Sequence, residues 1–266
     1  MRAPIDHNLL RQKYNPDGSP LRNLQLRTLE ILRSFDEICQ RHNIRYWLGY
    51  GSLLGAVRHS GFIPWDDDID VEILREDYSR LMEILPKELP SQYILQTHKT
   101  DDTYIYLFNK LRDLNSCINE RTAINQTFKY RGAFIDLFMV EPTYHSLTKI
   151  AAVLYNRLCF NVANKGETWM SLAKINYRML TKIVFPCFRL LSKCAPKHIL
   201  RLTFGVNFLD KRHVSDIFPL QRIMFEGVEC NAPANPDGYL TKIYGDYMKI
   251  PDHKDIHIVD NQIELW

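Results

Sequence analysis

The chain has 266 residues, of which 45% are hydrophobic and 24% are charged. This composition is typical of a folded globular protein and excludes a disordered or fibrous one. The net charge of +3 is too small to indicate a nucleic-acid-binding protein, and no apolar run reaches the ~20 residues that a membrane span requires.

Charge is unevenly distributed along the chain. Residues 146–212 contain twelve Lys/Arg and two acidic residues, a net charge of +10, so the remaining chain carries −7. A basic segment is therefore inserted into an otherwise acidic protein. The six cysteines form no CxxC pair, and residues 1–18 lack the apolar segment of a signal peptide. We therefore expect reduced thiols and a cytoplasmic location.

Local patterns predict the elements in chain order. Residues 1–20 contain the loop signal NPDGSP, and apolar residues at helical spacing predict a helix over 21–42. Alternating and β-branched segments predict five strands, at 44–51, 68–74, 93–98, 104–112 and 131–142. Between them we expect helices at 52–59, with Ser52 as the N-cap, and at 76–89.

The second half of the chain has a different pattern. Residues 146 to about 203 are predicted to be mostly helical. A hairpin is predicted over 222–233, around Glu226-Gly227, followed by a helix over 238–248.

The segment GFIPWDDDIDVEIL, residues 61–74, places acidic residues in an apolar strand pattern. In a strand Asp68, Asp70 and Glu72 project from one face, whereas the apolar residues between them project from the other and enter a core. Neighbouring carboxylates repel each other unless a cation neutralises them, so the pattern predicts a divalent metal site. The alternative is a solvated edge strand or acidic turn.

Two further features favour a metal–phosphate site. Gly51-Ser52 lies between a predicted strand and a short helix, where free N–H groups attract phosphate, although a simple turn would look the same. Asp136 is an isolated acid in the apolar strand AFIDLFMV, and burial of an unpaired carboxylate is costly. A shared metal would neutralise Asp136, and so would a salt bridge to an arginine.

The order strand, Gly-Ser, short helix, paired acids and a later single acid resembles the nucleotidyltransferase fold. The motifs GSLLGAVRHSGFIPWDDDIDV, NKLRD, RGAFIDLF and YLTKIYGDYM resemble more closely those of the LicD family of phosphocholine transferases, to which the fukutin domain is related. The resemblance extends from about residue 44 to 251, but the basic segment matches no motif.

The resemblance implies an α/β (α+β) fold, a mixed, largely antiparallel sheet flanked by helices. We expect a single catalytic domain over 1–266, with a nucleotidyltransferase-like core at 21–145, a basic helical insert at 146–212 and a C-terminal hairpin and helix at 213–266. The insert could be an ordinary subdomain or an amphipathic surface for an anionic membrane.

The resemblance also implies a function: transfer of a phospho-alcohol, most simply phosphocholine, from CDP-choline or another CDP-alcohol to a glycan or lipid-linked glycan, with release of CMP. Mg²⁺ or Mn²⁺ would bind Asp68, Asp70 and Asp136, and Asp136, or less favourably Asp67, would be the base. The expected substrate-binding residues are Gly51, Ser52, Arg58, Lys110 and Arg112.

Two other enzyme classes use a similar acidic metal site. A nucleotide-sugar glycosyltransferase and a true nucleotidyltransferase would release a nucleoside diphosphate and pyrophosphate, respectively, instead of CMP. A non-catalytic glycan-binding domain is the remaining alternative. We expect no nucleic-acid partner, and a location in the cytoplasm, with peripheral contact at the inner face of the membrane through residues 146–212 as one option.

Overall fold

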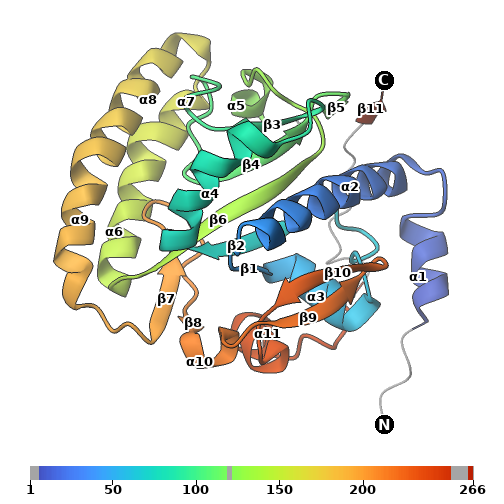
Figure 1. Ribbon diagram of the computed structural model, residues 1–266. Helices are drawn as coiled ribbons and strands as arrows, with labels where there is room; N and C mark the ends of the chain where they lie inside the picture. Colours follow the sequence, from blue (N-terminus) through green and yellow to red (C-terminus); the bar gives the residue numbers. More distant parts are fainter. Residues whose placement is uncertain (1–5, 119–121, 253–262, 266) are drawn as a thin grey trace.

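The computed structural model describes residues 6–118, 122–252 and 263–265 (Figure 1). Its centre is a twisted sheet in which strands follow the order β1-β2-β6-β4-β3, and β7 and β8 extend it beside β6. Among the described strands only β2 and β6 run parallel, so the predicted mixed, largely antiparallel sheet is confirmed. The strands are β1 Tyr46–Leu48, β2 Asp70–Leu74, β3 Tyr93–Gln96, β4 Asn109–Asp113, β6 Phe134–Pro142, β7 Ile199–Leu202 and β8 Arg212–His213.

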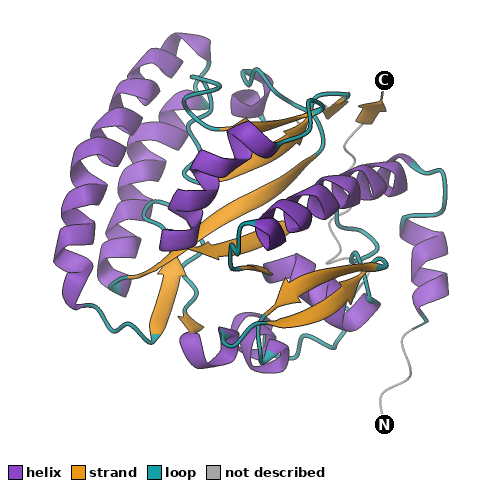
Figure 2. Cartoon of the chain, in the orientation of Figure 1, coloured by secondary structure: helices purple, strands orange, loops and turns teal. Residues whose placement is uncertain are grey.

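Helices surround this sheet, and two small strand pairs lie outside it (Figure 2). The helices are α1 His7–Tyr14, α2 Pro20–Arg41, α3 Tyr50–His59, α4 Arg75–Glu88, α5 Ala123–Gln126, α6 His145–Tyr155, α7 Asn161–Ala163, α8 Glu167–Met179, α9 Phe185–Leu191, α10 Val214–Ile217 and α11 Pro236–Tyr244. The pairs are the hairpin of β9 Gln221–Phe225 with β10 Val228–Ala232, and β5 Ser116–Ile118 with β11 Ile263–Leu265.

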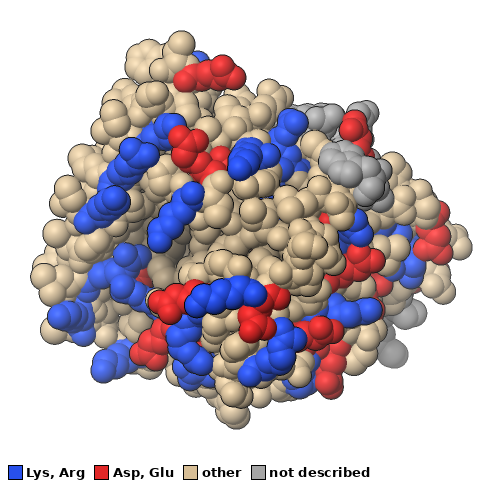
Figure 3. Space-filling model, turned by 45° about the horizontal axis from the view of Figure 1, so that its top comes forward, with Lys and Arg blue, Asp and Glu red and all other residues tan. Residues whose placement is uncertain are grey.

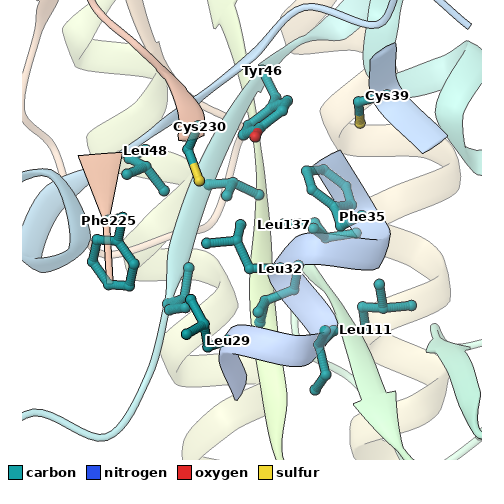
Figure 4. Packing of buried hydrophobic residues seen from close by; sticks show 14 of the residues in the cluster. Leu29, Leu32, Phe35, Cys39, Tyr46, Leu48, Leu111, Leu137, Phe225 and Cys230 are labelled. Carbon is teal, nitrogen blue, oxygen red and sulfur yellow. The ribbon is translucent and has the colours of Figure 1, made fainter. Parts of the chain in front are cut away.

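The main hydrophobic core lies between α2 and one face of the sheet (Figure 4). Helix α2 begins where Ser19 accepts a hydrogen bond from the Arg22 N–H and Pro20 occupies the first turn. Its apolar side chains pack on alternate residues of β1, β2, β4 and β6, with side chains of the β9–β10 hairpin closing the cluster. The predicted inward face of β2, formed by Ile69, Val71 and Ile73, is fully buried in this core.

The opposite face of the sheet carries the polar residues of β2, β4 and β6 and a smaller apolar cluster with β7. Helices α6 to α9 pack beside it around a separate apolar cluster. No helix within the described ranges is both long and apolar enough to cross a membrane.

Four local predictions were wrong. Residues 7–14 form helix α1 because Asp6 accepts a hydrogen bond from the Leu9 N–H. The strand expected over 104–112 begins only at residue 109, because the aromatic rings at 104–106 pack against the helical cluster instead of pairing. Residues 199–202, expected to be helical, form β7 beside β6. Helix α3 begins at Tyr50 after Gly49, so Ser52 is not its N-cap.

Candidate active site

Three charged side chains form a row across neighbouring strands on the polar face of the sheet. Asp70 of β2 is the register partner of Asp136 of β6, and Asp136 is the register partner of Lys110 of β4. Residues directly opposite each other on paired strands project from the same face. The sheet register therefore brings together three residues that are far apart in the sequence.

Asp68, Asp70 and Asp136 form what we call the carboxylate cluster. One carboxylate oxygen from each lies within 4.8 Å of the others. Asp66, Asp67 and Asp68 form a second group, in which one carboxylate oxygen from each residue also lies within 4.8 Å of the others. Carboxylate oxygens at this spacing are the ligands that Mg²⁺ and Mn²⁺ prefer, so the residues present fit a hard divalent cation.

Burial and repulsion from neighbouring aspartates raise the pKa of every member of the carboxylate cluster. Burial raises the pKa of Asp68 to about 6, with a further contribution from Asp67. The pKa of Asp70 is raised well above its usual value by burial, then by Asp68 and Asp136. The pKa of Asp136 is raised to about 6 by burial, although Lys110 opposes this shift. Each carboxylate is therefore costly to ionise until a cation compensates it.

Lys110 supplies part of that compensation. Its Nζ lies 2.7 Å from Asp136 Oδ1, and both side chains are nearly inaccessible to solvent. The same ammonium lies 3.2 Å from the centre of the Phe134 ring, which excludes water from one side of it. The salt bridge predicted as an alternative for Asp136 thus exists, with a lysine in place of the expected arginine. The Arg112 guanidinium also favours the ionised form of Asp136.

Gly51 and Ser52 contact the acidic segment directly. The buried Ser52 hydroxyl accepts a 2.7 Å hydrogen bond from the Asp70 backbone N–H. A Cβ atom at residue 51 would lie only 2.8 Å from Asp66 Oδ2, so glycine leaves room for that carboxylate. These two residues hold the acidic segment in place, and phosphate binding by them stays a prediction.

The two predicted arginines have partners within the protein. Arg58 donates to the backbone carbonyls of Tyr247 and Lys249 at 2.7 and 3.3 Å, which fastens the segment after α11 to α3. Arg112 is fully buried and donates to Gln96 Oε1 and the Gly132 carbonyl, each at 2.7 Å. Both arginines position the strands and segments around the cluster, and substrate contact by either one stays a prediction.

Glu72 follows the cluster along the polar face of β2, but its charge has a different partner. The Arg212 guanidinium donates to Glu72 Oε1 through Nε at 2.8 Å, and Trp47 Nε1–H donates to Oε2 at 2.9 Å. Both members of this ion pair are fully buried. The acidic segment thus contains one structural carboxylate beside the potential metal ligands.

Two features near the cluster were not predicted from the sequence. Tyr244, at the end of α11, is 42% exposed, and its pKa is raised by desolvation of the phenol and by the charges of Asp70 and Asp66. Phe208, half exposed in the loop after β7, has its ring centre 5.2 Å from that of Tyr50 and 6.3 Å from that of Phe138. Tyr244 lies in a recognised motif without an obvious role, whereas nothing in the sequence around Phe208 indicates a site.

Comparison with known proteins identifies a family and several relatives to which this chain is similar. The family described as LicD/FKTN/FKRP, nucleotidyltransferase domain, matches residues 43–165. The chain is 27% identical over 256 residues to the lipopolysaccharide cholinephosphotransferase LicD of Haemophilus influenzae, covering 88% of this chain and 94% of that protein. It is 48% identical over 48 residues to the human ribitol 5-phosphate transferase FKRP, covering 18% of this chain and 10% of that protein. Residues 43–165 of this chain are therefore similar to the nucleotidyltransferase domain of the LicD family, and the similarity to LicD itself extends over most of the chain.

Proposed function

We propose that this protein transfers a phospho-alcohol, most simply phosphocholine, from a CDP-alcohol to a hydroxyl of a cell-surface glycan or of its lipid-linked precursor, releasing CMP. Two transferases of phospho-alcohols, LicD and FKRP, are among its relatives, which supports the reaction class. The observation that carries the proposal is the carboxylate cluster, in which Asp136 is buried and Asp68 and Asp70 are half-buried, with Lys110 beside it, because this arrangement suits a metal-bound diphosphate.

The carboxylate cluster would hold one or two Mg²⁺ or Mn²⁺ ions. When bound, such an ion neutralises charge on the diphosphate oxygens of the donor. The protein side chains have complementary tasks. Asp68, Asp70 and Asp136 fix the position of the ion, and the Lys110 ammonium provides positive charge at the inner edge of the cluster.

The transfer step exchanges one P–O bond for another. The acceptor hydroxyl oxygen forms a bond to the phosphorus that bears the alcohol, and the bond from that phosphorus to the CMP oxygen breaks, so CMP leaves with the electron pair. The hydroxyl proton passes to a carboxylate, for which we favour Asp136 over Asp67.

The aromatic residues beside the cluster provide a surface for the alcohol. Phe138 lies two residues after Asp136 on the same strand face, and its ring contacts those of Tyr50 and Phe208. Phe208 is 52% exposed and can present its ring face to a ligand. A quaternary ammonium is attracted to aromatic faces, so this surface suits choline better than an uncharged polyol.

The direct test is a product assay with a panel of donors: CDP-choline, CDP-ethanolamine, CDP-glycerol and CDP-ribitol. Each is incubated with the protein, Mg²⁺ or Mn²⁺, and a mixed glycan extract, and released nucleotides are separated by chromatography. We expect metal-dependent CMP from one donor. Release of UDP from sugar nucleotides, or of pyrophosphate from nucleoside triphosphates, with no CMP from any donor, would contradict the proposal and assign the site to a different transferase class.

Replacement of Phe208 by alanine tests the assignment of the alcohol. We expect kcat/KM for CDP-choline to fall about tenfold, because a desolvated cation–aromatic contact contributes about 1–2 kcal/mol. The value for CDP-glycerol should change less than twofold, and Phe208→Tyr should restore choline transfer. Met224→Ala, at an equally exposed apolar residue of the β9–β10 hairpin, is the matched control. Equal losses for both donors would show that Phe208 does not recognise the alcohol.

Metal binding should stabilise the protein in a pH-dependent manner. Because the pKa values of Asp68 and Asp136 are about 6 in the folded protein, the folded state binds protons more tightly than the unfolded state. The metal-free protein should therefore lose stability as pH rises from about 4 to about 7. Mg²⁺ at 100 times its Kd should add about 2.7 kcal/mol, or roughly 5–10 °C in Tm, at pH 7.5.

The same addition at pH 5 should have a much smaller effect, because protons compete for the carboxylates. Thermal unfolding with Mg²⁺, and with NaCl at equal ionic strength as the control, measures this difference. An equal rise in Tm at both pH values would contradict metal binding by these carboxylates.

A further inference from the structure

The helical segment from Glu167 to Leu191 exposes a line of large apolar side chains. Helices α8 and α9 are joined by a π-helical turn, Leu180–Val184, so they continue as one rod (Figure 1). The exposed residues recur every three, four or seven positions and so lie along one side of it. We call this set the apolar stripe: Trp169, Leu172, Ile175, Met179, Ile183 and Leu190.

The apolar stripe lies on a different face of α8 and α9 from the one that packs against the rest of the protein. Met170, Ala173, Leu180 and Phe185 are buried in the cluster shared with α6. Ile175, Ile183 and Leu190 are each 61% exposed, so no other part of the described chain covers them. A long exposed apolar surface that takes no part in the hydrophobic core is typical of a binding surface.

Basic side chains accompany the apolar stripe. Residues 167–193 contain five Lys/Arg and one acidic residue. Lys174 pairs with Asp102 and Arg189 with Glu141, whereas Arg178, Lys182 and Lys193 are exposed and have no ion-pair partner among the described residues. In the space-filling view, Lys and Arg side chains recur down the side of the molecule formed by α8 and α9 (Figure 3).

We propose that this surface binds an anionic lipid bilayer, with the apolar stripe inserted at the boundary between headgroups and acyl chains and the basic residues against lipid phosphates. A helix of this pattern lies in the plane of the interface, in agreement with the absence of a spanning helix from the described ranges. A second copy of the chain is a poorer partner, because it would bring two basic surfaces together. The inference goes beyond the proposed transfer reaction and does not depend on it.

Vesicle binding tests this surface without any nucleotide donor. The protein is mixed with vesicles of phosphatidylcholine alone, or of phosphatidylcholine and phosphatidylglycerol at 7:3, and co-sedimentation and tryptophan emission are measured. We expect binding to the anionic vesicles to be at least tenfold stronger and to weaken as salt is added. Emission should shift to shorter wavelength, because Trp169 is 44% exposed before it enters the lipid, and Trp169→Phe should abolish this shift.

Two double variants separate the apolar and the charged contributions. Ile175→Ser/Ile183→Ser and Lys182→Glu/Lys193→Glu should each weaken binding to the anionic vesicles about tenfold or more. Leu9→Ser/Met224→Ser removes exposed apolar side chains of comparable exposure elsewhere, and should bind like the parent protein. Because all these side chains are exposed, unfolding curves should remain close to that of the parent.

Three results would overturn the inference. One is no binding to either kind of vesicle. Another is equal binding to neutral and anionic vesicles, which would contradict the role of the basic residues. The third is dimerisation without lipid, detected by light scattering and abolished by Ile175→Ser/Ile183→Ser, which would assign the surface to a second copy of the chain.

Discussion

Replacement of Asp70 by asparagine should abolish transfer without unfolding the protein. We expect kcat/KM to fall about 10³-fold or more, because the amide removes one charge from the proposed metal site and with it part of the stabilisation of the transferring phosphoryl group. In the metal-free protein the same change removes a half-buried carboxylate that is costly to ionise beside Asp68 and Asp136. The variant should therefore be as stable as the parent, or more stable, yet gain little from Mg²⁺.

CMP release and thermal unfolding of the same preparation measure both effects. Asp102→Asn is the matched control: it also converts an aspartate to an amide, but Asp102 is 65% exposed and forms its ion pair with Lys174 on the surface. Its activity should stay within twofold of the parent. Full activity of Asp70→Asn would remove the carboxylate cluster from the proposed mechanism, whereas an unfolded variant would show that Asp70 has a structural role.

Replacement of Glu72 by glutamine should destabilise the protein severely. The change removes the charge that compensates the Arg212 guanidinium, and both side chains have no exposed surface. An uncompensated buried charge costs about 3–5 kcal/mol, a large part of the stability of an ordinary domain. We expect a corresponding decrease in the free energy of unfolding, measured by urea denaturation, with a decrease in Tm of roughly 6–20 °C.

Two comparison variants identify the cause of that loss. Glu72→Leu/Arg212→Met replaces both charges by apolar groups and should recover much of the lost stability, because no buried charge then remains. Asp17→Asn removes a carboxylate from the exposed pair with Arg11, and should change stability by less than about 0.5 kcal/mol. A loss below about 1 kcal/mol for Glu72→Gln would contradict the view that this ion pair stabilises the fold.

Much of the fold could be predicted from the sequence because its signals are local. The helix over 21–42 and the turn at Glu226-Gly227 follow from apolar spacing and turn residues, and the structure places both within one or two residues of the prediction. The strand at 199–202 could not be recognised, because it is a short basic and apolar segment whose extended form depends on pairing with β6. Ser52 was wrongly predicted to be the N-cap of a helix. Its hydroxyl instead accepts a hydrogen bond from the Asp70 N–H, and the sequence cannot distinguish these two uses of a serine hydroxyl.

The sequence indicated which residues belong to the candidate site, but not which side chains form ion pairs with them. The acidic segment and Asp136 were recognised because charge in an apolar strand needs compensation. Their distances and the ion pair with Lys110 depend on sheet register, which is set by pairing between distant segments. Arg212, which compensates Glu72, and Phe208 both lie in the basic segment over 146–212, where sequence motifs gave no guidance.

Helices α6 to α9 lie in the connection between β6 and β7, and these two strands are direct antiparallel neighbours. The ends of this connection are therefore held side by side by main-chain pairing, whatever the length of chain between them. Loop closure depends only weakly on length, so insertion or loss of helices here need not disturb the strands that carry Asp70 and Asp136. In evolutionary terms, this connection is where an enzyme of this fold can acquire or exchange a surface-binding module while its catalytic strands stay in register.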